Sequence, residues 1–408
     1  MPSLNKPEPH LLTIGQFRNK TPADLLFGVL NRDLGLLFVC NLLGSFGDGL
    51  YAYLLPVYLS ENLGSSAAEI GMLYAVMSLL AASSLLVAGM LADKYDRKKI
   101  MIAGWAAWIP APLIFSLAGN WVQALPGMIL WGVWLGGPTT TAYIVATADK
   151  SRLTLTFTLM SAAWSLGYVF SPSLGGYLKG AIGMQYVFYM GALFYALACF
   201  ALFFIRSQHA ATPPTQTRQE QRSFFELLRT RKLLTLSAFF ACTMFTVMMF
   251  RPFVPKFMKD VYLYSDLGIG VLGSVLFAGS AVLGIVLGRL GDKRKTSYAL
   301  GVSLMMCSLS TLLIVLSGNF LALLAAFFVA GGSYLTWSLM GAIIGPLAPE
   351  SIRARWISVP QTVCMFSSFI APYIGGVLYD ISPFYPLYFA IVATLVIGIV
   401  AFTGFLDK

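Results

Sequence analysis

The stretch SPSLGGYL at residues 171–178 decides the fold, because APYIGGVL at residues 371–378 repeats its pattern 200 residues later. The proline and both glycines coincide in the two runs: Pro172, Gly175 and Gly176 correspond to Pro372, Gly375 and Gly376. A proline inside a helix frees backbone carbonyls and bends the helix, and paired glycines leave a face on which another helix packs closely. We therefore predict two equivalent helices that bend and pack tightly where two halves of the chain meet.

Three more pairs of motifs recur in the same order at offsets of 199 to 201 residues. An acid and an arginine three residues apart stand before each of the two runs: Asp149 and Arg152 before the first, Glu350 and Arg353 before the second. The other two pairs match LADK at 91–94 with LGDK at 290–293, and Pro56 with Pro255. Four ordered matches at one offset predict a duplication of six helices plus six.

The composition places these repeats in a membrane. The 408 residues are 58% hydrophobic and 11% charged, whereas soluble domains have about 45–50% apolar and about 25% charged residues. A membrane helix needs about 20 mainly apolar residues, and twelve such stretches follow one another. They lie near 34–59, 70–92, 100–118, 122–147, 154–178, 184–205, 233–255, 267–289, 298–317, 320–346, 356–379 and 384–405. The predicted fold class is an all-α polytopic membrane protein with twelve transmembrane helices in two pseudosymmetric halves.

The net charge of +10 reflects membrane topology, so a nucleic-acid partner is not expected. Of 27 Lys and Arg residues, three (Lys179, Lys256 and Lys259) fall in loops on one side, one (Arg251) falls inside a span, and 23 lie in the tails and alternate loops. Positive loops stay in the cytoplasm, which predicts a multi-pass inner-membrane protein with both termini inside. The predicted units are a cytoplasmic segment at 1–33, six-helix halves at 34–205 and 233–405, a cytoplasmic linker at 206–232 and a tail at 406–408.

Catalysis and metal binding are not expected. The five cysteines lie within apolar spans with no Cys or His neighbour at metal-binding spacing, and both histidines lie in cytoplasmic segments. No paired carboxylates or nucleophile constellation is visible. We therefore predict no catalytic residue, no metal, no cofactor and no enzyme activity.

Two motifs resemble those of the major facilitator superfamily. The run GMLADKYDRKK at 89–99 resembles its signature Gly-x-Leu-Ala-Asp-Arg-x-Gly-Arg-Lys, with Asp96 in place of the second glycine. Gly167 together with the run at 171–178 is similar to the helix 5 signature of the superfamily's exporters and antiporters. Its proton-coupled drug exporters carry an arginine on helix 4, four residues before a glycine. Here Gly132 occupies that position before Gly136.

The resemblance implies how the motifs act. It pairs helix 2 with helix 11, so Gly89 would allow close approach and Asp93 would meet the helix 11 start near Glu350 and Arg353. By pseudosymmetry, Asp292 would face the helix 5 start near Asp149 and Arg152. With Arg97, these contacts are predicted to hold the cytoplasmic side closed in one conformation. The alternative is that the loop charges only orient the protein.

Two ionisable residues lie well inside the spans, Asp48 and Arg251, and each costs about 2.5–3.5 kcal/mol at a helix centre. Asp48 lies eight residues before Pro56 and Arg251 four before Pro255, so their depths differ by one turn, about 6 Å. The resemblance places helices 1 and 7 face to face across a central cavity. We predict that Asp48 carries a coupling proton and that Arg251 pairs with it. The alternatives are a structural hydrogen bond for Asp48 and a surface-directed Arg251.

Aromatic and neutral polar residues are expected to line that cavity: Tyr51, Trp134, Tyr143, Trp164, Tyr168, Tyr334, Trp337 and Gln361. Such a lining suits an amphipathic or lipophilic small molecule. The favoured hypothesis is a monomeric secondary transporter that works by alternating access and exports such compounds in exchange for protons. The alternatives are a transporter, possibly an importer, of a small anionic metabolite anchored by Arg251, and a non-transporting membrane sensor or enzyme.

Overall fold

The computed structural model describes residues 30–149, 152–208, 230–344, 347, 353–404 and 406, and all regular structure in them is helical. Most of the predicted linker lies outside these residues. Five predicted gate and cavity positions also lie wholly or partly outside the described part. Glu350 is not described, and for four others only the helical backbone is described: Gly89, Asp93, Trp337 and Arg353.

The helices follow the predicted spans in order. The N-terminal half contains α2 (Arg32–Ala52), α3 (Leu55–Leu63), α4 (Ala67–Lys94), α5 (Arg97–Trp108), α6 (Pro110–Leu117), α7 (Trp121–Trp131), α8 (Gly136–Thr147), α9 (Leu153–Ile182) and α10 (Met184–Leu202). The C-terminal half contains α12 (Arg231–Phe250), η4 (Arg251–Phe253), α13 (Val254–Asp260), α14 (Asp266–Lys293), α15 (Thr296–Leu316), α16 (Phe320–Gly331), η5 (Gly332–Leu335), α17 (Thr336–Ile344), α18 (Arg353–Ile381) and α19 (Tyr385–Phe402). Each predicted span coincides with one helix or with consecutive pieces of one, which confirms the fold class.

The duplication extends to the places where helices break. The first span breaks between α2 and α3, and the seventh breaks at η4 between α12 and α13. Pro56 and Pro255 occupy the first turns of α3 and α13, where a missing backbone N–H is tolerated. The fourth span breaks between α7 and α8, and the tenth breaks at η5. In the described chain, ten helices are long and apolar enough to cross a membrane. The remaining two spans are the broken α7–α8 pair and α9.

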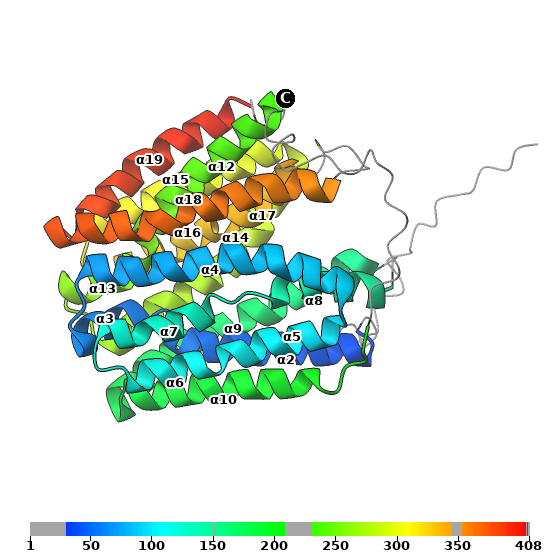
Figure 1. The fold of residues 1–408 in the computed structure, drawn as a ribbon. Helices are drawn as coiled ribbons and strands as arrows, with labels where there is room; N and C mark the ends of the chain where they lie inside the picture. The colour runs from blue at the N-terminus through cyan, green and yellow to red at the C-terminus, as the bar shows by residue number, and fades with distance from the viewer. Residues whose placement is uncertain are drawn as a thin grey trace, which may run out of the picture.

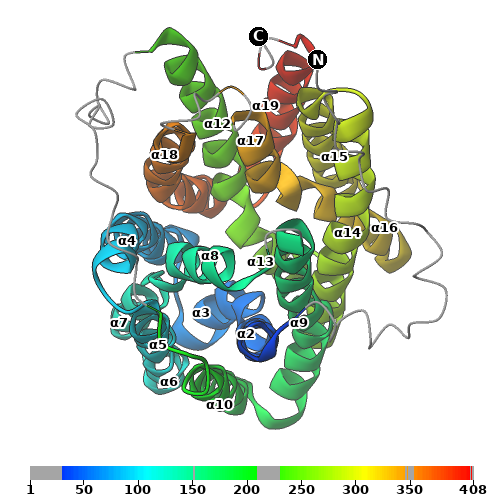
Figure 2. The ribbon, with the colours of Figure 1, turned by 90° about the vertical axis from the view of Figure 1, so that its right-hand side faces the viewer.

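The two halves lie side by side with their helices roughly parallel, as Figure 1 shows. The view along the helices in Figure 2 places α4 opposite α18 and α9 opposite α14, and both pairs are in contact. We call the end of the bundle with α3 and α13, at the left of Figure 1, the α3–α13 end. In that figure α4 and α18 lie close together at this end and diverge toward the other.

Each glycine pair of the repeated run serves two different interfaces. A Cβ atom on Gly175 would lie 1.8 Å from the Leu50 carbonyl oxygen inside the same half, and one on Gly376 would lie 2.1 Å from that of Ala67 in the other half. The equivalent glycines repeat this arrangement: Gly375 lies against Met249 of its own half, and Gly176 against Asp266 across the interface. Because real Cβ contacts are never this short, only glycine permits this backbone packing.

Candidate functional site

A cavity of about 230 Å³ lies between the two halves. Nine of its lining residues come from the N-terminal half and seven from the C-terminal half. Asp48 of α2 and Arg251 of η4 both line it, and aromatic and aliphatic side chains form most of the rest. The breaks in spans 1 and 7 position Pro56 and Pro255 on its wall. Because both halves contribute to its lining, the cavity is sensitive to their relative movement.

Three neutral side chains hold the carboxylate of Asp48. Trp131 of α7 donates its indole N–H to Asp48 Oδ1 at 2.8 Å. The hydroxyl of Tyr195 on α10 also donates to Oδ1, and the hydroxyl of Tyr168 on α9 donates to Oδ2. Behind them the hydroxyl of Tyr51 lies 2.8 Å from that of Tyr195. Asp48 is 5% exposed and forms no ion pair with any described Lys or Arg, so its hydrogen bonds are satisfied without a counter-charge.

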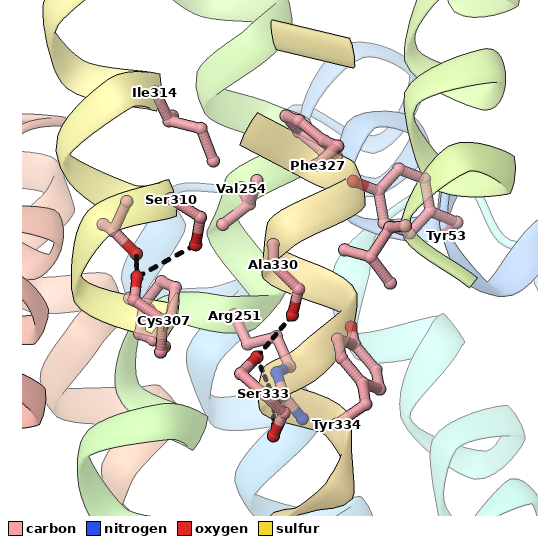
Figure 3. A pocket seen from close by; sticks show the side chains of 13 residues that line it. Tyr53, Arg251, Val254, Cys307, Ser310, Ile314, Phe327, Ala330, Ser333 and Tyr334 are labelled. Atoms are coloured by element: carbon pink, nitrogen blue, oxygen red, sulfur yellow. Dashed lines mark hydrogen bonds between the residues drawn. The ribbon is translucent and has the colours of Figure 1, made fainter. Parts of the chain in front are cut away.

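Arg251 begins the 3-10 turn that interrupts span 7. Its guanidinium lies 3.8 Å from the centre of the Tyr334 ring and donates to Ser333 Oγ at 3.2 Å and to the Ser333 carbonyl at 3.4 Å. Figure 3 shows these groups around a second, smaller cavity of about 30 Å³, which is lined by the C-terminal half and by Tyr53 of the N-terminal half. The predicted direct pair with Asp48 is not formed in this conformation, and Arg251 does not extend toward Lys256 and Lys259. It stays in the bundle as a charge without a described carboxylate partner.

Three aromatic rings lie in a row between Asp48 and Arg251. Tyr168, which donates to Asp48, packs its ring against Phe277 of α14 with centroids 4.5 Å apart. The ring centroids of Phe277 and Tyr334 are 5.5 Å apart. The guanidinium of Arg251 lies over the face of the Tyr334 ring. The contact between Tyr168 and Phe277 crosses from one half to the other. Asp48 and Arg251 therefore occupy the two ends of a continuous aromatic wall.

The structure brings only part of the predicted cavity lining together. Tyr168 and Tyr334 line the cavity, as do Tyr74, Trp131 and Phe277, which the sequence analysis did not single out. Trp131 directly precedes the break at Gly132, and a break in a membrane helix could have drawn attention to it. Five predicted residues are not among the described residues that line either cavity: Tyr51, Trp134, Tyr143, Trp164 and Gln361.

Those five residues have other roles where the contacts define them. Tyr51 is fully buried behind Asp48, and Trp164 packs against Tyr168 at the edge of the site with centroids 5.8 Å apart. The Tyr143 hydroxyl donates to the Arg206 carbonyl at 3.0 Å, near the end of α10. Trp134 is 43% exposed. Aromatic content alone therefore did not separate residues around the cavity from packing residues.

Charged side chains from both halves meet at the α3–α13 end. Lys179 of α9 contacts Asp266 of α14 at 2.8 Å and Glu61 of α3 at 2.9 Å. Lys259 of α13 contacts the same two acids, Glu61 at 3.1 Å and Asp266 at 3.2 Å. We call these four residues the four-charge cluster. Two of its four contacts, Lys179 with Asp266 and Lys259 with Glu61, cross between the halves, so the cluster holds this end closed.

A helix cap adds to this closure. The carboxylate of Asp380, at the end of α18, accepts hydrogen bonds from the backbone N–H groups of Ala67 and Ala68 at 2.8 Å each. These donors are the first of α4, where a negative charge also complements the helix dipole. The C-terminal half thus caps a helix of the N-terminal half beside the Gly376 contact.

At the opposite end, the described hydrogen bonds of the Arg97 guanidinium do not reach the C-terminal half. The guanidinium donates to Gln208 Oε1, at the start of the linker, at 2.8 Å and to the Ala142 carbonyl, in the N-terminal half, at 3.3 Å. Asp149, Arg152 and Asp292 are exposed. The predicted latch at this end stays a prediction.

Comparison with known proteins gives a consistent result. The sequence model of the Major Facilitator Superfamily matches residues 37–265 and 236–408. The chain is 23% identical to multidrug resistance protein 2 of Bacillus subtilis over 375 residues, covering 88% of this chain and 92% of that protein. It is 22% identical to quinolone resistance protein NorA of Staphylococcus aureus over 377 residues, covering 90% and 95%. The fold is similar to the crystal structure of the nucleoside transporter NupG, with a TM-score of 0.73, 13% identity and coverage of 92% and 97%.

Proposed function

Since this chain belongs to the major facilitator superfamily and is a multi-pass membrane transporter, we propose that it exports lipophilic or amphipathic small molecules in exchange for protons. The observation that carries the proposal is the inter-half cavity, in which the carboxyl of Asp48 is held by neutral donors beside an aromatic wall. The names of the Bacillus and Staphylococcus relatives support export of drug-like compounds. Asp48 would carry the proton, because hydration of a buried carboxyl governs whether it holds one.

Alternating access gives the two ends of the bundle different roles. We place the end opposite α3 and α13 in the cytoplasm, because the basic loops lie there. The described conformation, closed by the four-charge cluster and Asp380, is then closed to the outside. In the alternate conformation the predicted latch would close the cytoplasmic end, through Asp93 and Arg97 in one half and Asp292 in the other.

The four-charge cluster offers a direct test of this assignment. Lys179→Gln removes a contact to Glu61 and one to Asp266, so it should favour opening of the α3–α13 end. Labelling of Ala52→Cys, a cavity residue, by an impermeant thiol reagent from outside should rise about two- to fivefold, since such pairs contribute about 0.2–1 kcal/mol. The background lacks the native cysteines, and Glu69→Gln is the control, because Glu69 only caps its own helix at this end. Unchanged labelling in Lys179→Gln would show that the cluster does not hold the gate.

Export coupled to protons is tested in inside-out membrane vesicles. With an interior made acid, the chain should drive uptake of ethidium, a lipophilic fluorescent cation, and nigericin should release the dye by collapsing the pH gradient. Vesicles from cells without the protein provide the background. Uptake equal to that background would contradict the proposal for this class of compound.

A second function remains open because Arg251 faces the cavity without a described carboxylate partner. A small anionic metabolite could bind there, with import as the direction. Uptake of a labelled anion by intact cells, lost in Arg251→Gln and kept in Asp48→Asn, would favour this alternative. The third hypothesis, a sensor or membrane enzyme, is set aside because the chain is a transporter of this family.

A further inference from the structure

Two opposite charges share one cavity, and each is held only by uncharged groups. The Asp48 carboxylate accepts from an indole and two phenols. The Arg251 guanidinium contacts a serine and the face of a tyrosine ring. Among the described residues, no ion pair involves either of them. The cavity therefore presents a negative charge from one half and a positive charge from the other.

Charges in an apolar environment are costly unless a counter-charge meets them. The hydrogen bonds from Trp131, Tyr168 and Tyr195 orient the carboxylate but do not cancel its charge. In the same way, Ser333 and Tyr334 orient the guanidinium and leave it positive. A cavity occupant that brings a cation to Asp48 and an anion to Arg251 would compensate both charges at once.

The wall between the charges sets the shape of that occupant. Tyr168, Phe277 and Tyr334 form a run of ring contacts from the acid to the base. Aromatic rings prefer offset stacked or edge contacts with other rings. A flat aromatic body would lie along this wall with its charged groups at opposite ends.

The geometry points to planar aromatic zwitterions as the substrate class, with the cationic group at Asp48 and the carboxylate at Arg251. This inference rests on the proposed transport function and narrows its substrate range. An aromatic cation would leave Arg251 without a counter-charge, and an aromatic anion would leave Asp48 without one. The zwitterion also contacts both halves through charge, so its affinity depends on how closely the halves approach.

The test uses four matched naphthalene probes and the full chain purified in detergent. 6-(Aminomethyl)naphthalene-2-carboxylic acid carries both charges, its methyl ester only the positive one, its N-acetyl derivative only the negative one, and the N-acetyl methyl ester neither. Titration calorimetry gives a Kd for each. The zwitterion should bind about tenfold or more tightly than either singly charged probe, since a charge-assisted hydrogen bond contributes about 1.5–3 kcal/mol.

Substitutions then assign each charge to its partner. Arg251→Gln should weaken the zwitterion and the anion about tenfold and leave the cation unchanged, whereas Asp48→Asn should weaken the zwitterion and the cation and leave the anion unchanged. Arg206→Gln is the control, because the Arg206 side chain is 85% exposed outside the cavity.

If a variant fails to fold, the probe affinities measured on the unaltered chain are sufficient to overturn the inference. A cation or neutral probe that binds as tightly as the zwitterion, or no binding of any probe, would overturn it. Ethidium uptake in vesicles would still judge the transport function separately.

Discussion

Asp48→Asn is expected to reduce proton-driven uptake of ethidium in inside-out vesicles to the background rate. An asparagine keeps the volume and one acceptor for Trp131 and Tyr195 but has no group that binds and releases a proton. Energy-independent exchange of dye across the membrane should continue at ethidium concentrations high enough to fill the weakened site, because exchange requires only that the loaded cavity alternate between the two sides. Loss of driven uptake with retained exchange is the signature of a lost coupling group.

Two controls separate coupling from structure. Asp33→Asn changes another buried acid on the same helix, outside the cavity and 8% exposed, and should leave driven uptake unchanged. Tyr168→Phe removes one hydrogen bond from Asp48 but keeps its carboxyl, so it should slow uptake without abolishing its dependence on the pH gradient. If Asp48→Asn vesicles still concentrate ethidium, Asp48 is a structural residue and the coupling site lies elsewhere.

A double variant tests how Asp48 and Arg251 interact. The two residues share the cavity and the ring wall without direct contact. If that wall couples them, the loss of binding free energy for the zwitterionic naphthalene probe in Asp48→Asn with Arg251→Gln should be smaller than the sum of the two single losses. Strict additivity would show that they act independently.

Gly376→Ala is expected to lower ethidium uptake about tenfold or more. Its new Cβ atom would lie 2.1 Å from the Ala67 carbonyl oxygen, so α4 and α18 must separate where the halves meet. Forced overpacking of this kind costs about 1–3 kcal/mol, and here the cost falls only on the conformation closed at the α3–α13 end. The same variant should therefore raise external labelling of Ala52→Cys, and Gly176→Ala should behave in the same way through Asp266.

The chain offers matched controls for this experiment. Gly180 lies on α9 one turn beyond Gly176, and a Cβ there would have no neighbour within 4 Å, so Gly180→Ala should be neutral. Gly175→Ala meets Leu50 within its own half. It should lower the thermal stability of the protein without selectively opening one end. Equal uptake in Gly376→Ala and Gly180→Ala would refute a closing role for the cross-half glycine contacts.

The residues around Asp48 show the limit of reading the sequence. Asp48 was identified because an acid in an apolar span is costly, and that reasoning needs only local sequence. Its partners Trp131, Tyr168 and Tyr195 lie 83, 120 and 147 residues away. Of these three, only Tyr168 is among the predicted cavity residues. In aromatic-rich membrane helices, no local sequence pattern shows which aromatic residues will contact Asp48.

The lysines at the α3–α13 end show that the sequence also does not predict which charged side chains pair. The sequence identifies Lys179 and Lys259 only as members of the less basic set of loops. The structure places them between Glu61 and Asp266, in a cluster that joins the halves. Side-chain pairs between separate loops depend on how close those loops come, and that distance depends on which end of the bundle is closed.

The sequence by itself determined the membrane class, the twelve spans, the duplication and the matched prolines Pro56 and Pro255. These features depend on apolar run length, charge placement and backbone chemistry, which are properties of neighbouring residues. Only the tertiary structure decided that Asp48 and Arg251 stand apart at the ends of an aromatic wall and that one end of the bundle is closed. Both follow from the relative placement of two halves that close glycine contacts and a few cross-half ion pairs hold together, and no local pattern encodes that placement.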